Sequence, residues 1–208
     1  DPENAIFINA YFPHRLMSLA DELNSKLIHI STDCVFSGAK EMPYIEKDFK
    51  DGKDTYAKSK GLGEIINKNH LTLRTSVVGP ELKRDGEELF HWFMSQTGEV
   101  NGFTKAIWSG VTTLILAKVV DWAIEYKITG LYHVTNNKNI DKFTLLTLMK
   151  KYTKKNILIN PFDGKELNKS FIDSRKELNF EIPTYDQMVK EMIAKTKNDK
   201  IIYSHYDF

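Results

Sequence analysis

Three residues, Thr32, Tyr56 and Lys60, are of the types that can together transfer a proton to a carbonyl oxygen. The spacing of four places Tyr56 and Lys60 one turn apart on the same side of a helix. An unperturbed phenol titrates at about pH 10 and a nearby ammonium favours the phenolate, so we expect Lys60 to lower the pKa of Tyr56. Such a tyrosine can act as a general acid while hydride arrives at the carbonyl carbon. Thr32 can hydrogen-bond the same oxygen from the carboxyl end of a strand, the edge at which open α/β sheets bind ligands.

The spacing of Tyr56 and Lys60 carries little weight by itself. The chain has 9 tyrosines and lysine is abundant, so about one Tyr-x-x-x-Lys pair is expected by chance. Tyr56 is the one tyrosine that satisfies the pattern. The catalytic interpretation therefore depends on context, namely a strand that ends in Ser-Thr-Asp, then a loop, then a helix that opens with the pair.

The elements that must position these side chains alternate along the chain. Strands and helices in alternation predict βαβ units and a mostly parallel sheet. Pro13 is expected to kink the first helix or to start a second segment, and residues 98–112 are expected to be irregular. We predict strands at 27–31, 71–78, 131–134 and 157–160, and helices at 5–23, 55–67, 87–96, 113–126, 142–152 and 185–194.

The composition excludes several classes of protein. With 41% hydrophobic and 27% charged residues among 208, the chain is neither disordered nor of low complexity. The net charge of +1 gives no support for a nucleic-acid partner, and no apolar run approaches the roughly 20 residues that cross a bilayer. The single Cys34 suggests a reducing compartment, and no two of the 6 histidines form a close metal-ligand pair. We expect a soluble cytoplasmic protein without a metal site, bound neither to nucleic acid nor to a membrane.

Several segments together resemble one family. Residues 27–38 resemble the Ser-Thr-Asp-Tyr-Val-Phe-x-Gly block of dTDP-4-dehydrorhamnose reductases, which are extended short-chain dehydrogenase/reductases that act on nucleotide sugars. Residues 43–46 match the Pro-Tyr-x-Glu that follows in the family, and residues 56–64 match its Tyr-Gly-x-Ser-Lys-x-x-Gly-Glu, with Ala57 in place of glycine. Residues 73–76, 110–113 and 116–117 continue the family's order, so that the matches extend from about residue 1 to residue 148.

The resemblance implies reduction of a 4-keto-6-deoxy sugar on a nucleotide by NADPH or NADH, in surface polysaccharide synthesis. A homodimer is a further expectation. It assigns Thr32 as the substrate hydroxyl, Tyr56 as the proton donor, and Lys60 as the residue that tunes the tyrosine and binds the nicotinamide ribose. Trp108 either stacks on a sugar or base or lies in the core, and Arg175 either binds the diphosphate or forms a surface ion pair. We predict that Ser31, Tyr56, Lys60, Ser76 and Val77 bind the cofactor and that Thr32, Asp33, Cys34, Val35, Trp108 and Arg175 bind the substrate.

The implied fold is α/β, a Rossmann-like doubly wound parallel sheet whose amino-terminal part is missing, with a smaller carboxyl-terminal α/β substrate-binding region. We expect residues 1–79 to form the carboxyl-terminal half of the Rossmann-like domain and residues 80–208 mainly the substrate-binding region, with about 113–135 returning to the sheet. The glycine-rich turn that holds a pyrophosphate has no counterpart, because Gly61-Leu62-Gly63 lies inside a predicted helix. We therefore expect that the chain is the carboxyl-terminal portion of a longer reductase, or that preceding residues are missing, and that by itself it binds dinucleotides weakly or not at all.

The sequence differs from the family pattern at two positions, and two alternative functions remain open. Cys34 stands where the family has tyrosine, and Ser37 where it has an acidic residue, which suggests a different sugar. We expect Cys34 to be a structural thiol, since it has no adjacent basic residue, and Arg74 to be buried behind the site. One alternative function is a non-catalytic subunit of the same fold that binds a nucleotide sugar or dinucleotide. An epimerase or dehydratase of the superfamily is the other, and it is disfavoured because such enzymes need further acid/base residues near Thr32.

Overall fold

The computed structural model, which describes residues 1–164, 166–175 and 179–208, is an α/β structure with a parallel central sheet. The sheet joins β1 (Ile28–Thr32), β2 (Leu71–Thr75) and β7 (Gly130–His133) in the order β1-β2-β7. Both pairings are parallel, and Thr32 lies opposite Thr75. The carboxyl ends of these strands therefore meet at one edge, which confirms the predicted α/β class and the predicted parallel sheet.

The amino-terminal helix is interrupted, as the sequence predicts. The helix α1 (Pro2–Ile6) begins at Asp1, whose carboxylate accepts hydrogen bonds from the backbone of Glu3 and Asn4. It continues into a π-helical turn, η1 (Phe7–Tyr11), and then into α2 (Phe12–Glu22), which begins one residue before Pro13. Proline lacks the N–H that a helix interior needs, so the irregular turn lies immediately ahead of it.

The helix that carries Tyr56 and Lys60 is shorter than predicted. It is α3 (Thr55–Leu62), and its C-cap is Gly63. A Cβ atom on Gly63 would lie 1.8 Å from the backbone oxygen of Asn9, so only glycine lets α3 approach the amino-terminal helices this closely. The next predicted strand is divided into β2 and β3 (Val77–Val78), because the Ser76 carbonyl between them accepts a hydrogen bond from the backbone of Val111.

The carboxyl-terminal half contains more strands than predicted. Residues 98–112 are not irregular but form β4 (Gly98–Phe103), β5 (Ala106–Trp108) and β6 (Val111–Thr112). β4 pairs in parallel with β9 (Ile157–Phe162) over its whole length. This partner lies far along the chain, so the local glycine and threonine signals could not reveal it. The remaining elements are η2 (Asp33–Val35), α4 (Leu89–Ser95), α5 (Thr113–Glu125), β8 (Ile140–Asp141), α6 (Lys142–Thr153), β10 (Leu167–Asn168) and α7 (Tyr185–Asn198).

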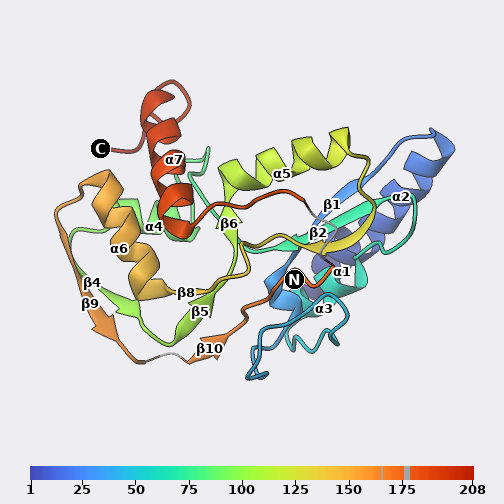
Figure 1. The fold of residues 1–208 in the computed structure, drawn as a ribbon, viewed down its shortest axis with the longest axis horizontal. Helices are drawn as coiled ribbons and strands as arrows, with labels where there is room; N and C mark the ends of the chain where they lie inside the picture. The colour runs from blue at the N-terminus through green and yellow to red at the C-terminus, as the bar shows by residue number, and fades with distance from the viewer. Residues whose placement is uncertain (165, 176–178) are drawn as a thin grey trace.

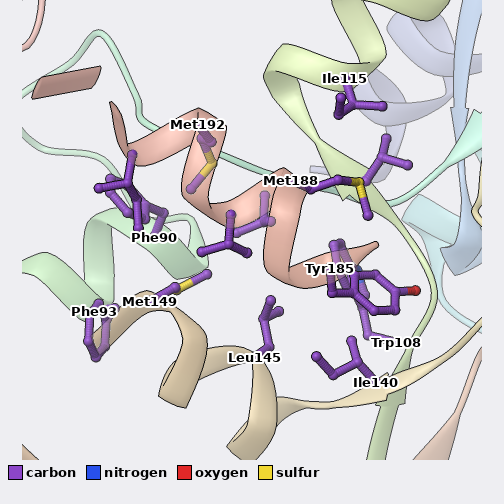
Figure 2. Close-up of a cluster of buried hydrophobic side chains, with 14 of the residues drawn as sticks. Phe90, Phe93, Trp108, Ile115, Ile140, Leu145, Met149, Tyr185, Met188 and Met192 are labelled. Carbon is purple, nitrogen blue, oxygen red and sulfur yellow. The ribbon is translucent and has the colours of Figure 1, made fainter. Parts of the chain in front are cut away.

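The main core lies where three helices of the carboxyl-terminal half meet. Figure 1 shows α4, α6, α7 and the β4–β9 pair at one end of the molecule, with α1, α2 and α3 beside β1 and β2 at the other. Figure 2 shows the buried side chains between α4, α6 and α7, which are Phe90, Phe93, Leu145, Met149, Met188 and Met192. A second, smaller cluster contains Val35, Phe36, Tyr44 and Phe171.

Two further observations concern the chain as a whole. In the described part of the chain, no helix is both long and apolar enough to cross a membrane. The pairing of β7 with β2 places residues 130–133 in the central sheet. The division of the chain at residue 79 into two regions remains a prediction.

Candidate active site

The structure brings Thr32 and Tyr56 together at the carboxyl edge of the central sheet. Thr32 is the last residue of β1, and its hydroxyl accepts a hydrogen bond from the backbone of Cys34 at 3.1 Å and donates to Asp33 at 3.2 Å. Tyr56 lies in the first turn of α3, which the Asp54 carboxylate caps by accepting from the backbone of Ala57 at 2.7 Å. The Thr32 side chain is close enough to Tyr56 to act on the pKa of its phenol. The two hydroxyls that the sequence predicts to share one carbonyl oxygen are therefore neighbours.

The pKa of Tyr56 lies above its ordinary value. Burial raises it, the polar Thr32 side chain opposes the increase, and the negative charge of Asp33 adds to it. The phenol is therefore protonated at neutral pH, which is the form that a proton donor needs. The predicted lowering of this pKa by Lys60 is wrong in this structure, since the Lys60 ammonium donates to the carbonyl of Ile30 at 2.9 Å.

A buried ion pair fixes the far end of α3 to the sheet. Glu64, just beyond α3, accepts two hydrogen bonds from the Arg74 guanidinium at 2.7 and 2.6 Å and one from the Ser31 hydroxyl at 2.6 Å. Lys50 approaches the same carboxylate at 3.2 Å. Burial alone would raise the pKa of Glu64, but its bonds with Arg74 and Ser31 hold the value below its usual range. Arg74 is 1% exposed, which confirms its predicted place behind the site.

The two residues that follow Thr32, Asp33 and Cys34, both have raised pKa values. Asp33 is buried, and burial raises the pKa of its carboxyl, while the positive charges of Lys169 and Lys142 oppose the increase. Burial and the Asp33 charge also raise the pKa of the half-buried Cys34 thiol. A thiol with a raised pKa is a poor nucleophile, which agrees with the predicted structural role. A hollow of about 280 Å³ lies beside these residues, with Cys34 and Lys169 in its lining.

Four predicted site residues have side chains that contact other parts of the protein, namely Ser31, Val35, Trp108 and Arg175. The Ser31 hydroxyl is occupied by Glu64, so that side chain faces the ion pair and not a cofactor. Val35 is 1% exposed, because its side chain completes the cluster around Phe36. Its side chain is thus not available to a substrate, and binding of substrate at Val35 stays a prediction.

Trp108 and Arg175 are likewise held by contacts within the protein. Trp108 is 4% exposed and lies against Tyr185 (Figure 2), with the Lys142 ammonium over its ring, so no aromatic face remains for a sugar. Arg175 lies over the Tyr132 ring at 4.1 Å and donates to the carbonyl of Leu131 at 3.1 Å, near the start of β7. That is the opposite end of the strand from the edge where Thr32 lies, and binding of the diphosphate by Arg175 stays a prediction.

Comparison with known proteins decides the family. The profile of the RmlD substrate binding domain family matches residues 1–198. The chain belongs to this family. It is 40% identical over 82 residues to a dTDP-4-dehydrorhamnose reductase of Sinorhizobium fredii, covering 38% of this chain and 28% of that protein. It is also 30% identical over 139 residues to the spore coat polysaccharide biosynthesis protein SpsK of Bacillus subtilis, covering 65% of this chain and 49% of that protein.

Solved structures share the fold of this RmlD-family chain. The dTDP-4-dehydrorhamnose reductase of Bacillus anthracis, solved in complex with NADP, superposes with a TM-score of 0.76 at 20% identity, covering 90% of this chain and 72% of that one. This likeness confirms the Rossmann-like fold class. The chain spans about half or less of the length of the two curated relatives, 28% and 49%.

The carboxyl edge of the RmlD-family sheet offers groups suited to the nicotinamide ribose of a dinucleotide. Tyr56 is 48% exposed and Val77, just beyond β2, is 40% exposed. Ser76 lies between β2 and β3 at the same edge. The Tyr56 hydroxyl and the Lys60 ammonium are the polar donors here that fit a ribose. Gly63 lets α3 pack against the backbone of Asn9 and Gly61 lies within α3, so the two glycines form no phosphate-binding turn.

Sequence reasoning missed three residues of the site region. Lys142 begins α6, and its charge acts on Asp33 across the fold, a relation that no local spacing shows. Glu46 and His133 are both buried and hydrogen-bonded to each other, the His133 backbone donating to Glu46 at 3.0 Å. Glu46 lies in the segment that matches the family's Pro-Tyr-x-Glu. This motif was the sequence signal that could have pointed to Glu46.

Proposed function

We propose that this chain is the substrate side of a reductase that uses NADPH or NADH to reduce a nucleotide-activated 4-keto-6-deoxy sugar. The observation that carries the proposal is the meeting of Thr32 and Tyr56 at the carboxyl edge of the sheet, with Lys60 one turn further along α3. The RmlD family and relatives named as dTDP-4-dehydrorhamnose reductases support the sugar class. The relative named for spore coat polysaccharide biosynthesis supports a role in surface polysaccharide synthesis, and we propose that this role is cytoplasmic.

In the proposed reaction the chain's own residues bind and protonate the carbonyl oxygen. When bound, the nicotinamide supplies the hydride that adds to the carbonyl carbon. The Thr32 hydroxyl orients the oxygen, and the neighbouring Tyr56 phenol, held in its protonated form, gives its proton to that oxygen. An ammonium has three N–H donors and Ile30 takes one from Lys60. The other two N–H donors of Lys60 would bind the nicotinamide ribose.

The residues around this centre divide into a cofactor side and a substrate side. Tyr56, Lys60, Ser76 and Val77 would hold the nicotinamide ribose, because they border the carboxyl ends of β1 and β2. On the substrate side, Thr32 would take the carbonyl, and the backbone and side chains around Asp33 and Cys34 would line the sugar. Lys169, whose charge reaches Asp33, is the cation best placed for a nucleotide phosphate.

The test is oxidation of NADPH and of NADH by the full-length natural protein, given a 4-keto-6-deoxy nucleotide sugar. The proposal expects oxidation of the cofactor that depends on the nucleotide sugar. The oxidation is measured as the loss of absorbance of the reduced nicotinamide. Binding of the nucleotide sugar is measured in parallel by calorimetry. Tight binding without any oxidation would contradict the reductase and support the alternative, a non-catalytic binding subunit.

The possible homodimer remains a prediction. Light scattering of the full-length natural protein measures its mass directly, and a monomer at micromolar concentration would contradict the prediction.

A further inference from the structure

A short segment of the carboxyl-terminal half lies across the central sheet. We name residues 170–174 the strap. Its backbone pairs with Tyr44, which donates to the Ser170 carbonyl at 2.8 Å and accepts from the Ile172 backbone at 2.9 Å. The backbone of Phe171 donates to the Ser109 hydroxyl at 2.9 Å, and its ring is buried in the smaller apolar cluster. The strap follows Lys169 directly, so the position of the strap sets the position of that lysine.

Two buried polar side chains hold the strap against the end of β7. One ring nitrogen of His133, Nδ1, lies 2.9 Å from the Ile172 carbonyl oxygen. The Glu46 carboxylate accepts from the Ser174 backbone at 3.1 Å and from the Ser174 hydroxyl at 2.5 Å. The other oxygen of Glu46 accepts from the His133 backbone at 3.0 Å. The strap is therefore anchored twice, and both anchors meet at His133.

The second ring nitrogen of His133 connects the strap to the ion pair behind the active site. His133 Nε2 lies 2.8 Å from the Arg74 guanidinium. A carbonyl only accepts and a guanidinium only donates, so His133 must be neutral, with its proton on Nδ1. Burial lowers the pKa of His133 to about 4, which keeps the ring in that form at neutral pH. Hydrogen bonds thus run without a break from Ile172 through His133 and Arg74 to Glu64, and from Glu64 to Ser31 beside Thr32.

We propose that His133 is a positioning residue that fixes the strap, and with it Lys169, relative to Thr32 and α3. The proposal rests on the reductase function proposed above, and it names what holds the substrate side in place. A strap that is released at Ile172 would move Lys169 away from the nucleotide, while Thr32 would keep its hydrogen bonds with Asp33 and Cys34 and stay beside Tyr56. Loss of His133 contacts should therefore weaken nucleotide-sugar binding and leave the chemical step nearly unchanged.

Two substitutions of His133 separate its hydrogen bond to Ile172 from its hydrogen bond to Arg74. An asparagine amide can take the place of Nδ1 and donate to Ile172, whereas a glutamine amide can take the place of Nε2 and accept from Arg74. His133→Asn and His133→Gln each keep one bond and lose the other. Loss of one net hydrogen bond corresponds to roughly a three- to tenfold change in an equilibrium constant. We expect each variant to raise KM for the nucleotide sugar by about that factor, with kcat within about twofold of wild type.

A milder variant and a matched control accompany these two. Ser174→Ala removes one bond to Glu46 at an exposed position and should raise KM in the same direction by a smaller factor, even if the His133 variants do not fold. His91→Asn changes a half-buried histidine that bonds Tyr206 at 3.1 Å in the distant carboxyl-terminal cluster, and it should leave KM unchanged. Melting temperatures of all variants record how far each is destabilised.

The outcomes distinguish this proposal from the proposed function. Raised KM with preserved kcat in the His133 and Ser174→Ala variants supports the positioning role. Lowered melting temperature with KM unchanged in all of them overturns it, because His133 would then only fill the core. If the natural protein reduces no sugar, calorimetry with the nucleotide diphosphate alone still gives the answer. A dissociation constant that is equal in wild type, His133→Asn and Ser174→Ala would overturn the proposal.

Discussion

Removal of Arg74 isolates the contribution of the buried ion pair to stability. The guanidinium is 1% exposed and its partner Glu64 has a fully buried side chain, with two contacts at 2.7 and 2.6 Å. Arg74→Met would leave that carboxylate without its main counter-charge. Breaking a buried pair by removing one partner costs about 3–5 kcal/mol. Lys50 and Ser31 still contact Glu64, so we expect the low end of that range, about 3 kcal/mol.

The measurement is urea and thermal unfolding of the chain, followed by circular dichroism. For a chain of this length about 1 kcal/mol moves the melting temperature by about 2–4 °C, so Arg74→Met should lower it by about 6–12 °C. Arg15→Met, at an exposed position of α2, is the matched control and should change the free energy of unfolding by less than about 0.5 kcal/mol.

The double variant Arg74→Met, Glu64→Met tests the cause of the loss. With both charges removed, no unpaired carboxylate remains in the interior, so the double variant should be more stable than Arg74→Met alone. The reasoning is refuted if Arg74→Met costs no more than Arg15→Met. It is also refuted if the double variant is less stable than the single one by the full cost of a second buried truncation.

Two further predictions concern pH and helix packing. Burial lowers the pKa of His29 and His133 to about 4 from the ordinary 6.5, so the unfolded chain takes up these protons first. The stability that the neutral rings contribute is therefore fully present above about pH 6.5 and is lost as the pH falls toward 4. Urea unfolding at several pH values should show that His29→Gln loses less unfolding free energy over this range than wild type. An identical pH dependence in the two proteins would disprove the assignment. Gly63→Ala places a methyl group 1.8 Å from the Asn9 oxygen and should cost about 1–3 kcal/mol. Gly61→Ala in the same helix meets nothing closer than 3.4 Å and should be neutral or stabilising, so equal melting temperatures for the two variants would show that close packing at Gly63 is unimportant.

Local signals predicted the helices better than the strands of this chain. The predicted helix 113–126 is α5 (Thr113–Glu125), since its apolar period is local and the capping Thr112 lies immediately before it. β4 was missed because its partner β9 lies far along the chain, and pairing of distant strands leaves no local pattern. The predicted strand 71–78 was too long because the sequence does not show that Ser76 binds Val111.

The site was predictable where one helix and one strand end determine it. The strand that ends in Ser-Thr-Asp and the helix that opens with Tyr56 lie together at one edge of the sheet, while the roles of Thr32, Tyr56 and Lys60 stay predictions. Residue type alone could not decide between surface and core for Val35 and Trp108, because burial depends on which distant elements cover them. The direction in which Lys60 points was also beyond the sequence, since a main-chain carbonyl competes with the phenol for its ammonium.

The most direct test of the central claim is the kinetic effect of Tyr56→Phe in the full-length natural protein. The substitution keeps the ring and removes the proton that the phenol would give to the carbonyl oxygen. General acid catalysis contributes about a hundred- to ten-thousand-fold, so kcat should fall by a factor in that range while KM for the nucleotide sugar stays within about threefold. Tyr11→Phe, an exposed tyrosine of η1, is the control and should leave both constants unchanged. A kcat for Tyr56→Phe equal to that of wild type would remove Tyr56 from its role.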